Sequence, residues 1–175
     1  IDDPLTKQIS VFNRWKWQDE NKMVQFGVKG LIDDRAGGQT TFDYGNDYGT
    51  TNSYGFGSVS TQVEAFAKGG MPVNKEGHAV AFMSSYRYHN QDAYYGLRDY
   101  DGTQNSAYLN LIYSGIFGNT NHTFATGFST TYDDYNESFN DSSYARTEYV
   151  PGAFFEYTLK NAYTFTGVFG IRGDY

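Results

Sequence analysis

The segment NHTFATGFSTTYD, from Asn121 to Asp133, shows the pattern that dominates this chain. Its even positions carry Phe124, Phe128 and Tyr132, whereas its odd positions carry small or polar residues. A period of two indicates a β-strand, because successive side chains point to opposite faces of a sheet. The alternation fits a soluble sheet over a core. It fits equally a membrane barrel that turns its aromatic face to lipid and its small polar face to the lumen.

Eight segments show this alternation, and together they predict an all-β, antiparallel, up-and-down fold. Every charged residue within them falls on the polar face, which otherwise mixes Gly, Ser, Thr, Ala and Gln. This suits a hydrated lumen, and a Lys or Arg on a lipid-facing row would cost about 2–4 kcal/mol near the bilayer midplane. The predicted strands are 9–18, 24–32, 59–68, 79–89, 107–113, 121–133, 148–159 and 163–174.

The lengths of the strands and of their connections favour a membrane barrel. Thirteen residues at ~3.3 Å each, tilted by ~45°, cross roughly 30 Å, which is one bilayer core. Short and long connections alternate, as in outer-membrane barrels with short periplasmic turns and long extracellular loops. The short connections are 19–22, 69–77, 117–120 and 160–162, and the long ones are 33–57, 90–103 and 134–146.

Aromatic residues gather at both ends of the predicted strands, which predicts two interfacial belts. Trp15, Trp17, Tyr157 and Tyr163 lie beside short connections, and Tyr86, Tyr88, Tyr132 and Tyr149 lie beside long ones. Pro151 falls inside the seventh strand, where it lacks an N–H for the ladder. We therefore expect a β-bulge there, near the outer rim.

The order of the connections predicts an orientation. Because the first connection is short, the first strand would run inward from the extracellular side, and the eighth would run outward. Complete barrels of this class begin and end in the periplasm. We therefore expect eight consecutive strands of a larger wall, with a gap between Ser10–Trp17 and Phe165–Arg172.

Composition narrows the class of protein. The chain has 175 residues, of which 19% are aromatic and 20 are Gly, and this favours β structure with many turns. It contains no Cys, which excludes a disulfide scaffold and a thiolate site. A net charge of −7 argues against a nucleic-acid partner. The longest clean apolar run, Ala79–Met83, is far too short for a transmembrane helix.

Four stretches carry a resemblance to a known family. They are DDRAGGQ (33–39), YYGLRDYDGTQNSAYLNLIY (94–113), YDDYNESF (132–139) and RTEYVPGAFFEYT (146–158). They are similar to the barrel of Bacteroidetes-type TonB-dependent outer-membrane receptors, especially cobalamin and siderophore receptors, over nearly the whole chain. The resemblance implies a 22-stranded barrel around an N-terminal plug, energised through a TonB box. Residues 1–175 would be a middle part of the barrel domain, without the plug.

The predicted long loops hold the candidate ligand-binding residues. Aromatic side chains among Gly and Asn suit capture of a bulky ligand or docking of a surface lipoprotein, and they suit packing between loops equally well. The candidates are Tyr44, Tyr48, Tyr54, Phe56, Tyr94, Tyr95, Arg98 and Tyr100.

No catalytic constellation is present, and we expect neither enzymatic activity nor a cofactor. His78, His89 and His122 share no metal-ligand spacing, and His78 and His122 are expected at an interface. The acidic residues of the last long loop are hard oxygen ligands that could hold Ca²⁺, although a solvated acidic loop explains them as well. These residues are Asp133, Asp134, Glu137 and Asp141.

The sequence therefore predicts an outer-membrane receptor that takes up cobalamin, haem or a ferric siderophore with energy from the TonB complex. The implied partners are outer-membrane lipid, the receptor's own plug and remaining strands, TonB through the plug, and a surface lipoprotein. Two alternatives remain open. One is a soluble extracellular β-sandwich that binds glycans, and the other is a small self-contained outer-membrane barrel.

Overall fold

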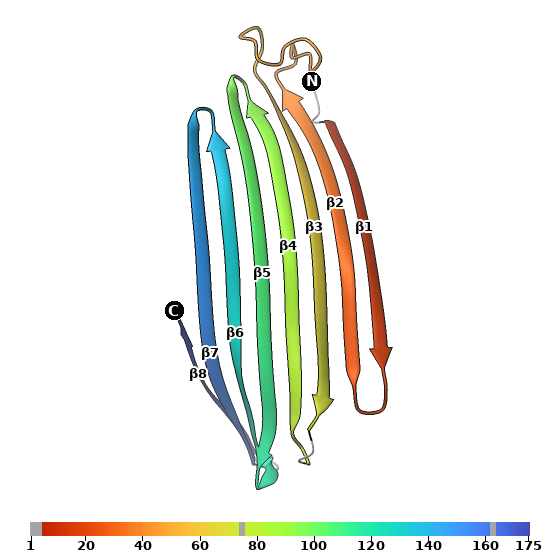
Figure 1. The fold of residues 1–175 in the computed structure, drawn as a ribbon, viewed down its shortest axis with the longest axis vertical. Coiled ribbons are helices and arrows are strands. Elements are labelled where there is room, and N and C mark those ends of the chain that lie inside the picture. Colours follow the sequence, from red (N-terminus) through yellow and green to blue (C-terminus); the bar gives the residue numbers. More distant parts are fainter. Residues whose placement is uncertain (1–4, 74–75, 162–163) are drawn as a thin grey trace.

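The computed structural model describes residues 5–73, 76–161 and 164–175, and it forms a single antiparallel sheet. Each strand pairs with the next along the chain, which confirms the all-β, up-and-down prediction (Figure 1). The strands are β1 Leu5–Gln18, β2 Met23–Gly38, β3 Gly55–Pro72, β4 Ala79–Tyr95, β5 Arg98–Phe117, β6 Asn119–Phe139, β7 Ser142–Asn161 and β8 Phe165–Asp174. In this described part, no helix is long and apolar enough to cross a membrane.

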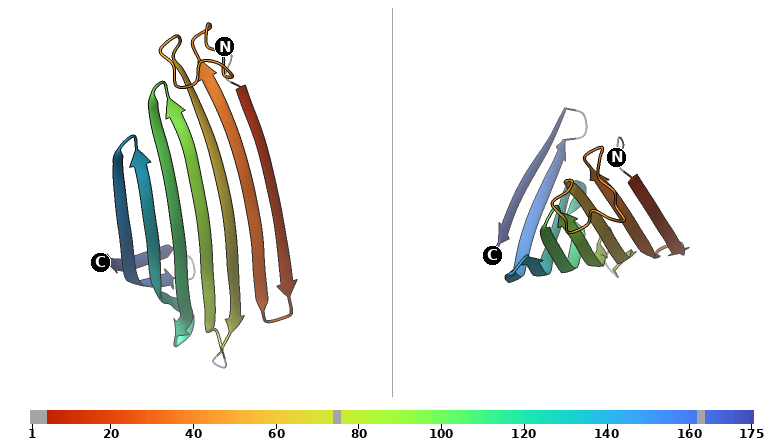
Figure 2. Two further views of the ribbon diagram at one scale, coloured as in Figure 1. Left: turned by 45° about the horizontal axis from the view of Figure 1, so that its top comes forward. Right: turned by 90° about the horizontal axis from the view of Figure 1, so that it is seen from above.

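The sheet is curved and open. Figure 2 shows β7 and β8 turned out of the plane of the earlier strands. Among the described residues, β1 pairs only with β2 and β8 pairs only with β7. The expected gap between Ser10–Trp17 and Phe165–Arg172 is therefore confirmed, and one edge of each terminal strand lacks a neighbour.

Two of the three predicted long loops are wrong. Most of 90–103 and 134–146 belongs to extended hairpins, so that β6 alone has 21 residues. The β4–β5 turn consists of Gly96 and Leu97, and the β6–β7 turn consists of Asn140 and Asp141. Gly96 and Asn140 have φ of 65° and 51°, which Gly and Asn adopt more readily than other residues. Of the three predicted long loops, only the β2–β3 connection is a loop in the described residues, and it is shorter than predicted, at residues 39–54.

The pairing register assigns each strand residue to one of two faces. Val28 pairs with Asn13 and Ala65, and their neighbours continue the same row across the sheet. The apolar face defined in this way includes Ile9, Trp15, Val28, Val63, Tyr86, Leu111, Phe128, Tyr132, Phe155 and Ile171. The polar face includes Gln25, Lys29, Glu64, Arg87, Gln104, Ser129 and Glu156. Gln25 and Ser129 on this polar face are only 8% and 3% exposed.

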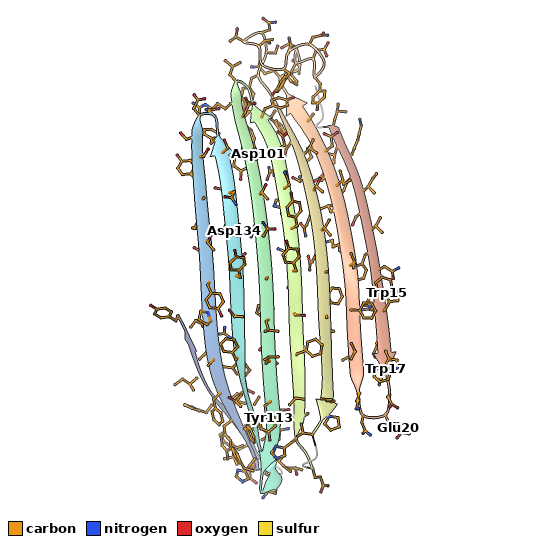
Figure 3. The ribbon with its side chains drawn as sticks, in the orientation of Figure 1. Trp15, Trp17, Glu20, Asp101, Tyr113 and Asp134 are labelled. Carbon is orange, nitrogen blue, oxygen red and sulfur yellow. The ribbon has the colours of Figure 1, made fainter. Side chains whose placement is uncertain are left out.

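Charges on the apolar face occur only beyond the predicted alternating runs. On the strands that the structure describes, these charged residues are Lys7, Asp34, Asp92, Asp99, Asp101 and Asp134. Lys7 pairs with Asp34 and Asp92 pairs with Asp101, so the charges form a boundary across the sheet. From this boundary to the short turns, the apolar face is uncharged. Figure 3 shows Asp101 and Asp134 toward one end, and Trp15, Trp17 and Tyr113 toward the other.

The expected bulge at Pro151 is also wrong. Pro151 pairs with Thr130 in a continuous β6–β7 register, and the irregularity of the sheet lies instead at Ile116 and Phe117. The carbonyl of Pro151 accepts a hydrogen bond from the backbone N–H of Tyr175 (3.0 Å), on the side of β8. In an antiparallel ladder the N and C=O of one residue face the same neighbour. The nitrogen of Pro151 therefore faces Tyr175, and because proline has no N–H it donates no hydrogen bond to the ladder there.

Candidate functional site

Two aromatic belts bound the uncharged part of the apolar face. Phe124 and Tyr132 on β6 are eight residues apart, as are Tyr149 and Tyr157 on β7. Eight residues span about 27 Å along a strand, or roughly 20 Å across a membrane at a ~40° tilt. This is close to the ~25 Å apolar band of outer-membrane barrels. All the predicted belt residues lie on this face except Tyr163, which is outside the described residues.

Part of the belt beside the short turns is a connected aromatic cluster on β5–β7, which His78 joins from just before β4. His78 is 3% exposed, and its Nδ1 lies 2.7 Å from the hydroxyl of Tyr113. His122 repeats the arrangement, with its Nδ1 2.5 Å from the hydroxyl of Tyr157. Phe124 stacks on Phe117 between these two pairs, with ring centroids 4.4 Å apart. Both histidines thus bind tyrosine at the edge of the band, where an apolar ring with a polar tip is favoured.

The eight candidate ligand-binding residues do not form one site. Tyr94, Tyr95, Arg98 and Tyr100, expected in a loop, lie on β4 and β5, and Phe56 lies on β3. Phe56, Tyr95, Arg98 and Tyr100 belong to the polar face, whereas Tyr94 belongs to the apolar face. Tyr44, Tyr48 and Tyr54 lie in the 39–54 loop as predicted. Adjacent strand residues point to opposite sides, which separates Tyr94 from Tyr95.

The 39–54 loop brings Tyr44 and Tyr48 to the same side as Tyr94. These three tyrosines and Asp92 help to line a hollow of about 400 Å³. The rings of Tyr48 and Tyr94 meet edge to face, with centroids 4.6 Å apart. The Asp99 carboxylate raises the pKa of Tyr48, and burial raises the pKa of Tyr94. The hollow faces the side of the wall that carries the apolar band.

The polar face carries a hydrogen-bonded network at the end of the sheet farthest from the short turns. Gln104 is its centre, because its Nε2 lies 2.9 Å from the hydroxyl of Tyr135 and 2.8 Å from Oγ of Ser106. The same nitrogen is 3.3 Å from Oδ1 of Asp133, which also accepts a hydrogen bond from Ser106. Side-chain networks of this kind fix the positions of their members.

Tyr100 and Glu137 extend this network toward the rim. The Tyr100 hydroxyl donates to Oε1 of Glu137 (3.2 Å), and burial, followed by the Glu137 charge, raises the pKa of Tyr100. Tyr100, Glu137, Gln104 and Tyr135 line a hollow of about 190 Å³ together with His89, Gln91, Gly102 and Thr103. The Arg146 guanidinium lies 4.8 Å from the Tyr135 ring centroid and lines a neighbouring hollow that shares Tyr135 and Glu137. The first hollow therefore offers rings, amides and a carboxylate, and the Arg146 cation lies beside it.

Several residues of this surface were missed by the sequence analysis, namely His89, Gln91, Gln104, Tyr135 and Arg146. The sequence did contain one signal that could have identified Tyr135. Continuing the odd-position row of β6 past Asp133 places Tyr135 and Glu137 on the same face. The contact between Gln104 and Tyr135 depends on the β5–β6 register, which the sequence pattern alone does not specify.

The calcium candidates do not converge. Asp133 and Glu137 lie on the polar face of β6, Asp134 lies on the apolar face, and Asp141 lies in the turn. Asp134 instead accepts a hydrogen bond from Oγ1 of Thr147 (2.8 Å). In the described ranges, no three His, Asp or Glu side chains are grouped so that they could hold a metal ion. The expected acidic loop was wrong because this segment continues the strand.

Comparison with known proteins identified no relative of this chain. No protein-family model matches the chain, and no curated protein matches it.

Proposed function

We propose that this chain forms part of the wall of an outer-membrane receptor that imports a scarce nutrient. The observation that supports this proposal most directly is the uncharged apolar band. It has aromatic belts at both limits and a polar, hydrogen-bonded face on the other side of the sheet. Together with the family resemblance, this favours an active transporter that takes up cobalamin, haem or a ferric siderophore with energy from the TonB complex. The chain acts by binding and conduction, without catalysis.

The exposure of the apolar band argues against a soluble sandwich. Ile9, Val63, Phe128 and Ile171 are 67%, 47%, 42% and 63% exposed on one continuous face. A soluble sandwich would cover such a face with a second sheet, yet all eight strands lie in one sheet. Soluble monomers rarely expose apolar patches of more than a few hundred Å². A lipid bilayer is the medium that such a face fits.

The open edges of β1 and β8 are the places where further strands would join the wall. An unpaired edge in lipid leaves N–H and C=O groups without partners, at several kcal/mol each. In the proposed receptor, additional strands complete a barrel of about 22 strands, and a plug fills the polar side. The hollow at Tyr44, Tyr48 and Tyr94 faces away from this lumen, so it is better placed for a surface lipoprotein than for the transported ligand.

Growth on limiting nutrients tests this function. We expect a strain that lacks the gene to lose growth on one of three limiting supplies, namely cobalamin, haem or siderophore iron, and to recover when the gene is restored. The full-length protein should fractionate with the outer membrane and should require detergent for extraction. Normal growth on all three supplies would contradict the transport proposal, and recovery in the soluble secreted fraction would contradict the membrane location.

Alanine substitutions on the two faces should separate ligand contacts from external ones. Tyr100→Ala and Gln104→Ala remove side chains from the polar hollow, and each should weaken binding of the rescuing nutrient by roughly five- to thirtyfold, or about 1–2 kcal/mol. Tyr44→Ala is the matched control, because this loop tyrosine lies on the other side of the wall and should leave affinity unchanged. Binding of the radiolabelled nutrient to whole cells gives the dissociation constants. A greater loss of affinity in Tyr44→Ala than in Tyr100→Ala would show that the ligand binds beside the 39–54 loop and would contradict binding on the polar face.

A further inference from the structure

An apolar hollow crosses the apolar face beside the short turns. It has a volume of about 280 Å³ and is lined by Trp17, Val24, Gly69, Met71, Val80 and Phe82, among others. Gly69 is necessary for its shape, because a Cβ there would lie 2.8 Å from the Phe82 ring and 2.9 Å from the Met23 carbonyl. With this volume, the hollow has room for part of one acyl chain.

A second hollow, whose lining includes charged residues, adjoins the apolar one at the β1–β2 turn. Lys22, Met23, Met71 and Val80 are among the residues that line both hollows, whereas Asp19 and Glu20 line only the second. Figure 3 shows Glu20 at the tip of this turn, beyond Trp17. In the described part of the chain, no ion pair engages Lys22 or Glu20. The turn thus presents a free ammonium and a free carboxylate at one end of an apolar groove.

We propose that these joined hollows bind one phosphatidylethanolamine molecule from the bilayer leaflet at the short-turn end. An acyl chain lies along Gly69 and Phe82, the lipid phosphate pairs with Lys22, and the lipid ammonium pairs with Glu20. Of the three charged residues of the turn, Asp19 accepts a hydrogen bond from the backbone N–H of Glu20 (2.7 Å). The charges of the other two, Lys22 and Glu20, match the two charges of this headgroup in sign. An anionic headgroup such as phosphatidylglycerol would pair with Lys22 through its phosphate. It has no cation, so the Glu20 carboxylate would remain unpaired. This inference rests on the proposed membrane function.

Photocrosslinking in the full-length protein tests the lipid site. Benzoylphenylalanine would replace Met71 inside the groove or, as control, Phe155, which lies on the same face outside it. The protein is reconstituted in vesicles of equal phosphatidylethanolamine and phosphatidylglycerol, and the adducts are identified by mass spectrometry. We expect phosphatidylethanolamine to be enriched about threefold at position 71, the effect of one exposed ion pair, with no enrichment at position 155. Glu20→Lys, a change in an exposed turn, should reverse the preference at position 71.

The outcomes separate this site from the function on which it rests. Lipid adducts of equal composition at both positions, or enrichment at position 71 that Glu20→Lys leaves unchanged, would overturn the site while leaving the membrane location intact. A protein adduct at position 71 would also overturn it. Absence of lipid adducts at both positions would contradict the membrane proposal itself. A shift in gel mobility on boiling, retained by each variant, shows that the barrel has folded.

Discussion

Moving one positive charge from the polar face of β2 to its apolar face should prevent assembly of the protein in the outer membrane. Val28 is 44% exposed on the apolar face, and Lys29 follows it on the polar face. The double variant Val28→Lys with Lys29→Val keeps composition and net charge but places an ammonium in the middle of the band. At this depth, a lipid-facing Lys costs about 2–4 kcal/mol. The amount of heat-modifiable protein in outer-membrane fractions measures the effect.

The single variants are the controls for this exchange. Lys29→Val removes a charge from the polar face and should assemble almost normally. Val28→Lys alone should fail as the double variant does, because only the face of the charge matters. Normal assembly of the double variant would show that the apolar face of β2 does not meet lipid.

A cysteine pair across the gap should not form a disulfide within one chain. The natural sequence contains no Cys, so introduced thiols have no competitors. Val11 on β1 and Phe169 on β8 are 65% and 63% exposed on the apolar face of the two edge strands. In residues 1–175 expressed alone, Val11→Cys with Phe169→Cys should give crosslinks between chains but none within a chain. Unpaired edges favour association with other strands.

A neighbouring pair provides the positive control. Val11 and Gly30 are register partners on β1 and β2, and a Cβ added at Gly30 meets nothing within 4 Å. Paired residues in adjacent strands have Cβ atoms about 4.5–5.5 Å apart, close to disulfide geometry. Val11→Cys with Gly30→Cys should therefore crosslink within the chain under mild oxidation. An equal yield from the Val11 and Phe169 pair would mean that the eight strands close by themselves, as in the small-barrel alternative.

The sequence by itself determined the number of strands, their order and the faces of their central parts. Phe124, Phe128 and Tyr132 were assigned to one face by their spacing, and the register confirms this face. The reason is physical, since two different media on the two sides of a sheet impose a period of two on the residues between them. Where the media differ, as along the apolar band, the pattern is strong enough to predict the strand.

Only the tertiary structure decided where the strands end and which residues share a site. From His89 to Asp92 and from Asp133 to Ser138 both faces carry polar residues, so alternation disappears although the backbone ladder continues to the turns at Gly96 and Asn140. The sequence therefore suggested loops where hairpins exist.

The tertiary structure also decided which residues share a site. Tyr94 and Tyr95 are neighbours in sequence but lie on opposite faces. Gln104 and Tyr135 are 31 residues apart, and the β5–β6 register brings them together, because hydrogen bonding between strands sets the register.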